Sequence, residues 1–332
     1  MRNQRFQSKV TAGRFTLPAA ILITIICWIV AAPLYSHTEV PMTDPQWLCN
    51  LTTETFPHWL VLLISFVLHG AIAFFLINLN NAFALIRVRA SIQSAIYFLL
   101  IGACPFAHGT LSGLLCTVCY LIAIQLLFAS YREECTSSQL FHSFALAGIA
   151  GIIAPPYMLL APLLWIGAFS FYALNARSLA ASVVGFAFPW WLLLGYATLT
   201  GNLTDFFQRI IEIQVFQPIG MGFEAIPGVS LLFLFLLFTV SAVHCIVAGY
   251  EDKIRTRTYL YFLSFFGLCL YIYVFLQPFL FVSFCPILLC ITSILAGHLF
   301  ALTNNRLSNA FFIFSLTGTL ALFIFNLIWT LL

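Results

Sequence analysis

The sequence predicts an all-α fold, a polytopic helical membrane bundle of about 11 transmembrane helices. Hydrophobic residues make up 62% of the chain and charged residues 7%, whereas about 25% of the residues of a soluble domain are charged. The apolar residues gather in long tracts, and the basic residues lie in every second gap between them, which is the positive-inside pattern. We therefore expect residues 1–332 to form a single transmembrane domain.

The tracts set the expected helices, because a helix needs about 20 apolar residues to cross the hydrocarbon core. They are residues 15–36, 59–79, 93–108, 110–130, 140–155, 157–174, 179–200, 228–249, 258–276, 279–302 and 309–332. Three longer apolar stretches are divided by turn signals, at Pro105 with His108-Gly109, at Pro155-Pro156 and at Gln277-Pro278. Proline and glycine mark turns, so each stretch is expected to be a hairpin of two helices.

The amino-terminal segment 1–14 is a basic tail with four Lys or Arg residues, followed by the apolar tract 15–36. That tract is longer than the apolar region of a signal peptide, which has about 7 to 15 residues. We expect a retained first helix and a cytoplasmic amino terminus. With this number of crossings the carboxyl terminus lies outside.

Charge placement gives the orientation of the remaining helices. Of the 13 Lys and Arg residues, 12 fall in the tail or in inner connections, and Arg209 is the exception. The inner connections are 80–92, 131–139, 175–178, 250–257 and 303–308. Formal charge is +8 inside and −5 outside, which gives the net +3 of the chain. The expected location is the cell inner (cytoplasmic) membrane, in multi-pass form.

The second long outer connection, 201–227, contains an amphipathic pattern near 204–216. Its polar residues share one helical face and its apolar residues the other, which is typical of a helix lying in the interface. One interpretation is a solvated surface helix. The other is that Arg209, with Gln208 beside it, binds an anionic headgroup or a pyrophosphate through the planar guanidinium.

The first outer connection, 37–58, carries three carboxylates and two histidines. It is either a solvated loop or a source of a general base and of oxygen ligands for a divalent metal. Asp44 and Glu39 are the candidate catalytic residues. No metal-binding or cofactor-binding spacing occurs in the chain, so the sequence predicts no metal site and no cofactor, with a divalent metal expected only for the enzyme interpretation.

The expected spans carry no Asp, Glu, Lys or Arg in their central halves. This argues against an ion-coupled carrier with a buried carboxylate, because intramembrane ionisable residues mark such pathways. Five histidines lie in or at the ends of spans: His69, His108, His142, His244 and His298. We expect them to form hydrogen bonds between helices.

Two stretches, Leu79–Pro105 and Phe144–Pro189, resemble an uncharacterised family of polytopic inner-membrane proteins of Bacteroidota. The resemblance rests on Leu-Asn-Asn-Ala-Phe-Ala-Leu-Ile-Arg in the first stretch, and in the second on Ala154-Pro-Pro-Tyr and Gly185-Phe-Ala-Phe-Pro. It covers about the middle third of the chain. It implies a bacterial cytoplasmic membrane and a role in the cell envelope.

The architecture also resembles the membrane-embedded glycosyltransferases that use lipid-linked sugars. That resemblance implies Asp44 or Glu39 as the catalytic acid and Arg209 facing the lipid phosphate. The first outer connection is, however, short and lacks the paired acidic motif usual there. The function predicted first is an envelope protein of undetermined activity with its working face outside. The alternatives are the glycosyltransferase-like enzyme and a lipid or small-solute transporter. Expected partners are membrane lipids, with a lipid-linked glycan for the enzyme, and no nucleic acid.

Overall fold

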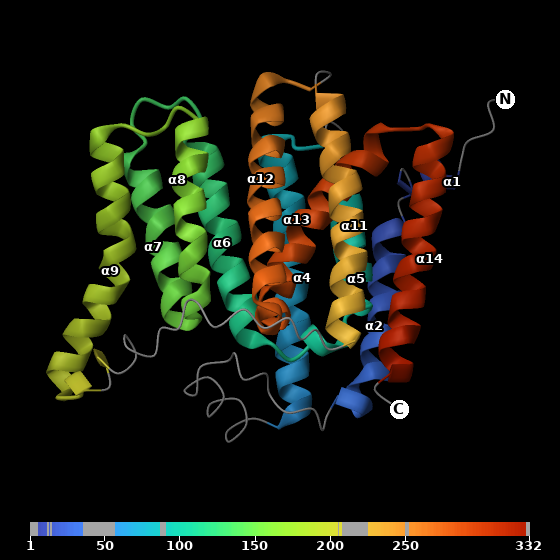
Figure 1. The fold of residues 1–332 in the computed structure, drawn as a ribbon, viewed down its shortest axis with the longest axis horizontal. Helices are drawn as coiled ribbons and strands as arrows, with labels where there is room; N and C mark the ends of the chain where they lie inside the picture. Colours follow the sequence, from blue (N-terminus) through green and yellow to red (C-terminus); the bar gives the residue numbers. More distant parts are fainter. Residues whose placement is uncertain are drawn as a thin grey trace. The chain divides into compact units, whose positions relative to one another are not determined.

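The computed structural model describes residues 6–11, 13, 15–35, 57–86, 91–204, 206–207, 225–249 and 252–329. Within this described part the regular structure is entirely helical (Figure 1). The chain divides into two compact units, residues 1–111 with 221–332 and residues 112–220. We call them unit 1 and unit 2.

Each apolar tract predicted from the sequence contains a helix. The helices are α1 (Phe6–Thr11), α2 (Thr16–Tyr35), α4 (His58–Phe83), α5 (Ile92–Gly102), α6 (Leu111–Ala129), α7 (Ser137–Ile153), α8 (Ala161–Ser170), α9 (Ala176–Thr200), α11 (Ala225–Ala248), α12 (Ile254–Leu276), α13 (Phe281–Leu302) and α14 (Arg306–Trp329). Among the described residues, eight helices are long and apolar enough to cross a membrane. The chain is thus an integral, multi-pass membrane protein, while α5, α7 and α8 are shorter and the count of about 11 crossings stays a prediction.

The three predicted hairpin breaks are confirmed. A 3-10 turn stands at each: η1 (Pro105–Ala107), η2 (Pro155–Leu160) and η4 (Pro278–Leu280). Each turn begins with proline, which has no N–H to donate and a fixed φ suited to the first position of a helical turn. The proline ends the preceding helix and starts the next.

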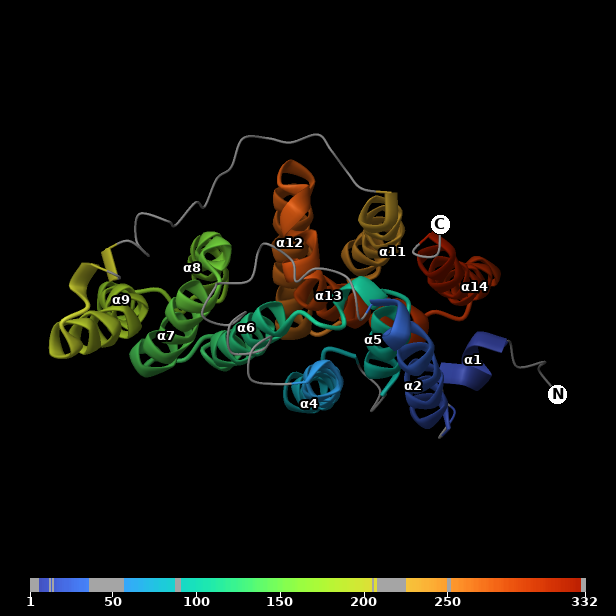
Figure 2. The same ribbon diagram turned by 90° about the horizontal axis from the view of Figure 1, so that it is seen from below.

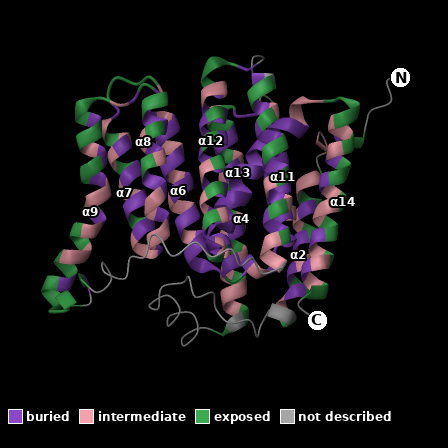
Figure 3. Ribbon diagram, in the orientation of Figure 1, coloured by how far each residue is buried: buried purple, intermediate pink, exposed green. Residues whose placement is uncertain are grey.

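Helix α13 is the centre of unit 1. Of its apolar window 89% is buried, and it packs against α5, α11 and α12, which flank it in Figure 2. Figure 3 shows that α13 is buried along its length, whereas α14 is largely exposed or half-buried. A helix that is apolar on all sides is expected in the interior of a bundle.

Connections predicted to share the inner face of unit 1 lie together. The Gln7 side chain of α1 donates hydrogen bonds from Nε2 to the carbonyls of Phe300 and Thr303, both at 2.8 Å. Thr256 Oγ1 donates to the carbonyl of Ala84 at 3.3 Å. The amino-terminal tail thus meets the α13–α14 connection, and the start of α12 meets the end of α4. We call this end of unit 1 the inner end, since charge predicts that it faces the cytoplasm.

Unit 2 is built around close packing of α7 and α9. A Cβ placed on Gly148 would lie 2.5 Å from the carbonyl oxygen of Phe186, and one placed on Gly185 would collide with the carbonyl oxygen of Phe141. Only glycine permits such an approach of two backbones, as in the small-residue interfaces of membrane helices.

Candidate functional site

The four site residues predicted from the sequence, Asp44, Glu39, Arg209 and Gln208, lie outside the described residues. Most of the predicted interfacial helix 204–216 also lies outside them. Their roles stay predictions. The candidate site described below comes from α11, α12 and α13 and from the short connection between the first two.

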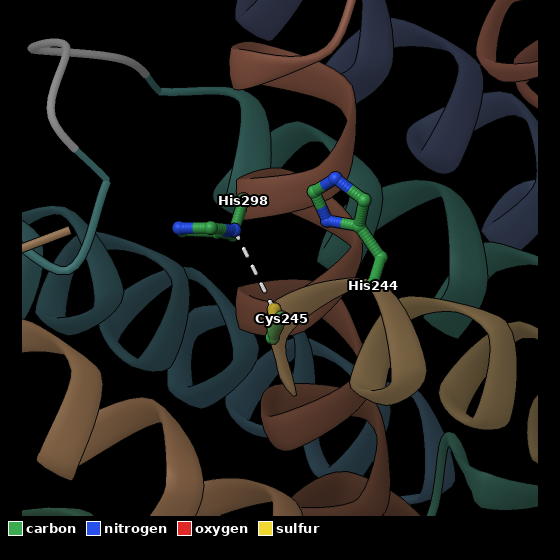
Figure 4. A group of neighbouring side chains, drawn as sticks. All are labelled: His244, Cys245 and His298. Atoms are coloured by element: carbon green, nitrogen blue, oxygen red, sulfur yellow. Dashed lines mark hydrogen bonds between the residues drawn. The ribbon is translucent and has the colours of Figure 1, made fainter. Parts of the chain in front are cut away.

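A chain of polar contacts joins Asp252, His298 and Cys245 at the inner end of unit 1. His298 Nε2 lies 3.1 Å from Asp252 Oδ2, with both side chains 1% exposed. His298 Nδ1 lies 3.5 Å from the Cys245 sulfur (Figure 4). A neutral imidazole that donates Nε2–H to the carboxylate presents its Nδ1 lone pair to the thiol, so the carboxylate assigns this tautomer.

The local sequence explains how these groups meet. Helix α11 ends at Ala248 and α12 begins at Ile254, and between them the N–H of Asp252 donates to the Gly249 carbonyl at 3.1 Å. This turn brings the carboxylate back toward the bundle. His298 lies one turn before the end of α13 at Leu302, so it faces the turn at the same depth.

A groove of about 440 Å³ lies between α11 and α12. Its lining is almost wholly apolar: Phe235, Phe238, Thr239, Ala242, Val243, Ile246, Tyr261, Ser264, Phe265 and Leu268. Ser264 is 6% exposed, and its hydroxyl makes no hydrogen bond within the described residues. Buried hydroxyls are normally bonded, so the Ser264 hydroxyl is an unusual polar group in the wall of an apolar groove.

The inner end of the groove is basic. A Cβ on Gly249 would lie 3.4 Å from both the Tyr261 hydroxyl and Arg257 Cγ. Tyr261 lines the groove, and Arg257 lies beside the same glycine as the Tyr261 hydroxyl. Arg257 is therefore at the inner end of the groove. Lys253 is exposed one helical turn before Arg257. Arg255 faces Tyr259, which does not line the groove: its Nε donates to the Tyr259 hydroxyl at 2.6 Å, and the Tyr259 ring packs on Phe83 of α4. This is the arrangement expected of cations and aromatic residues at a membrane interface.

A second polar cluster joins α2, α4 and the α5–α6 connection. Trp28 stacks on His108 with ring centroids 3.5 Å apart and planes at 9°. His108 Nε2 is 3.0 Å from the Ile101 carbonyl. Burial lowers the pKa of His108 to about 3, against a smaller opposite effect of that carbonyl. His69 Nδ1 lies 2.7 Å from the Tyr97 hydroxyl, which confirms the predicted interhelical role of His69.

The prediction that the histidines form hydrogen bonds between helices is wrong for His142, and for His298 it is incomplete. His142 is exposed, and its Nδ1 bonds within its own helix to the Ser138 carbonyl at 2.7 Å. The pairing of His298 with Asp252 was not predicted, because 46 positions separate them and no local spacing connects them. The available signal was a pair of acidic residues, Glu251 and Asp252, in a basic connection and one histidine at the matching end of another helix.

No family model, no curated protein and no solved structure matches this chain. The resemblances to the Bacteroidota family and to lipid-linked-sugar glycosyltransferases therefore stay predictions. Function is argued from the geometry of the site.

Proposed function

We propose that the protein binds an anionic membrane lipid in the groove between α11 and α12, as part of a role in the cell envelope. One hydrocarbon chain lies along the groove, an ester oxygen at its head accepts a hydrogen bond from the Ser264 hydroxyl, and the phosphate lies beside Lys253 and Arg257. The observation that carries this proposal is the unbonded, buried hydroxyl of Ser264 in an apolar groove that ends at cationic side chains.

The physical basis of selectivity follows from the surroundings. Lipid chains are as apolar as leucine, so burial in the groove gives little hydrophobic preference over the bilayer. Preference has to come from packing, from a hydrogen bond to Ser264, and from charge. Each basic residue near the membrane surface attracts an anionic lipid by about 1 kcal/mol, so Lys253 and Arg257 favour it by about 2 kcal/mol in total, before screening by salt. The Asp252 carboxylate in the same turn faces His298.

The alternatives predicted from the sequence place their lipid at the outer face, at a site separate from this groove. A glycosyltransferase-like enzyme would take a lipid-linked sugar donor, itself an anionic long-chain lipid, with Asp44 or Glu39 as the acid and Arg209 with Gln208 at the phosphate. A lipid transporter would need the same recognition. Neutralising Asp44, Glu39 and Glu54 together without loss of a glycan phenotype would remove the enzyme alternative and leave lipid binding untouched.

Native mass spectrometry tests the proposal. The full chain is released from bilayers of equal phosphatidylglycerol and phosphatidylethanolamine, and bound lipids are counted. We expect one retained phosphatidylglycerol in the natural protein and at least a fivefold loss in Arg257→Gln. Ala242→Phe, which fills the groove, should have the same effect.

Arg306→Gln is the matched control, since Arg306 is also exposed at the inner end of unit 1 but does not line the groove. It should retain the lipid. Equal retention in Arg257→Gln and Ala242→Phe, or no preference for the anionic lipid, would overturn the proposal.

A further inference from the structure

We propose that His244, Cys245 and His298 form a binding site for a zinc ion at the inner end of unit 1. One ligand atom from each lies within 4.8 Å of the other two, and Figure 4 shows the three side chains gathered between α11 and α13. The Cys245 sulfur and His298 Nδ1 are 3.5 Å apart. Zinc bonds of about 2.3 Å to sulfur and about 2.0–2.1 Å to nitrogen, at the tetrahedral angle, place these atoms about 3.6 Å apart.

Asp252 supplies the outer shell of this site. Histidine ligands of zinc usually donate their other N–H to a carboxylate, which fixes the ring and the tautomer. Asp252 Oδ2 occupies this position, 3.1 Å from His298 Nε2. The nitrogen directed at Cys245 is then the one without a proton, so the imidazole is oriented for metal binding before an ion arrives.

The charges of the site balance when zinc is bound. Zinc displaces the thiol proton of Cys245, which leaves to solvent, and the thiolate becomes the ligand. The ion contributes two positive charges, and the thiolate and the Asp252 carboxylate one negative charge each. Neutral histidines add none. A buried cluster without net charge avoids the large desolvation cost of an isolated ion.

Burial favours a metal over a nucleophilic cysteine. The order Cys245, His298, Asp252 is also that of a nucleophile, a base and an orienting acid. Reactive cysteines lie in partly exposed surroundings, whereas Cys245 is 0% and His298 1% exposed. A substrate carbonyl would have to reach a thiol that has no exposed surface, while an ion occupies only the space between its ligands. Three protein ligands leave a fourth position for water.

The zinc proposal goes beyond the lipid proposal and does not depend on it. The three ligands do not line the groove, and metal content is measured without any lipid. Substitution of Arg257 should leave zinc binding unchanged.

Metal content of the full chain in detergent tests the site. After loading with Zn²⁺ and removal of free metal by gel filtration, we expect one zinc per chain. Co²⁺ in its place should give a thiolate-to-cobalt charge-transfer band. Cys245→Ser should abolish that band and weaken zinc binding at least tenfold, and Asp252→Asn should weaken zinc binding about 10- to 100-fold.

Two controls keep the outcome clear. Cys269→Ser on α12 and His142→Ala on α7 remove residues of the same types away from the site, and both should bind zinc normally. Zinc should raise the melting temperature of the natural chain more than that of Cys245→Ser at the same zinc concentration, since stabilisation of the folded state falls as binding weakens. No stoichiometric zinc in the natural chain, an unchanged band in Cys245→Ser, or rapid acylation of Cys245 by a thioester in metal-free protein would overturn the proposal.

Discussion

The carboxylate of Asp252 and the imidazole of His298 form a buried contact of 3.1 Å between the α11–α12 connection and the end of α13. This contact fixes the connection to α13, the most buried of the eight candidate membrane spans among the described residues. It also orients His298 toward Cys245. The Asp252–His298 pair therefore holds both the basic turn at the end of the lipid groove and the metal ligands.

Removing the Asp252 side chain should destabilise the protein. Hydrogen bonds to charged groups contribute about 1.5–3 kcal/mol, so Asp252→Ala should lower the free energy of unfolding by about 2 kcal/mol. Asp252→Asn keeps an acceptor oxygen and should cost less. Denaturant unfolding in detergent measures both. Glu133→Ala, at an exposed site, is the control. A loss in Asp252→Ala no larger than in Glu133→Ala would contradict this prediction.

Ser264→Ala should change stability and lipid binding in opposite directions. A buried hydroxyl without a partner costs about 1–3 kcal/mol, so the delipidated variant should be more stable by about 1 kcal/mol. Its affinity for phosphatidylglycerol should fall several-fold, because the hydrogen bond to the lipid is lost. Ser241→Ala is the matched control, since Ser241 Oγ already donates to the Leu237 carbonyl at 2.7 Å. Thermal melting and native mass spectrometry give the two readouts, and a fall in both for Ser264→Ala would argue against the groove.

Gly185→Ala should disrupt the packing of α7 on α9. The added Cβ would collide with the carbonyl oxygen of Phe141, which is backbone and cannot rotate away. We expect a loss of about 1–3 kcal/mol, as for other overpacked sites. Gly195 lies on the same helix with nothing within 4 Å of its Cβ position, so Gly195→Ala should be neutral or slightly stabilising. Equal melting temperatures for the two variants would show that α7 and α9 do not approach as described.

His108 should make stability depend on pH in mildly acidic solution. Its pKa is about 3 in the folded protein, compared with about 6.5 in an unfolded chain. Between these values the unfolded state binds more protons, so stability falls as pH falls from about 6.5 toward 3. The difference in melting temperature between the natural chain and His108→Phe, measured from pH 7 to pH 4, isolates this residue. A difference that does not change with pH would contradict the prediction.

Much of the fold follows from the sequence. The three proline-led turns were predicted because proline cannot continue the hydrogen bonds of the preceding helix, and each turn starts at the expected proline. The contact of Gln7 with the α13–α14 connection agrees with the alternation of charged connections. Both features could be predicted because each depends on residues that are close together in the sequence, the proline of a turn or the charges of a connection.

The candidate site was not predicted, because its residues come from separate helices. Asp252 reads as one charge among several in a connection, and Cys245 as a small apolar residue. Only the packing of α11 on α13 brings the cysteine to His298. The existence of the groove depends on the distance between α11 and α12 where they pack over α13. Side-chain packing sets this distance, and no local pattern in a single sequence encodes it.

A density map of the full chain in phosphatidylglycerol nanodiscs tests the central claim most directly. We predict continuous density for one lipid chain along the groove between α11 and α12, passing Ser264, with the phosphate beside Arg257. An empty groove, or a lipid with its phosphate at the opposite end of the groove, would contradict the account.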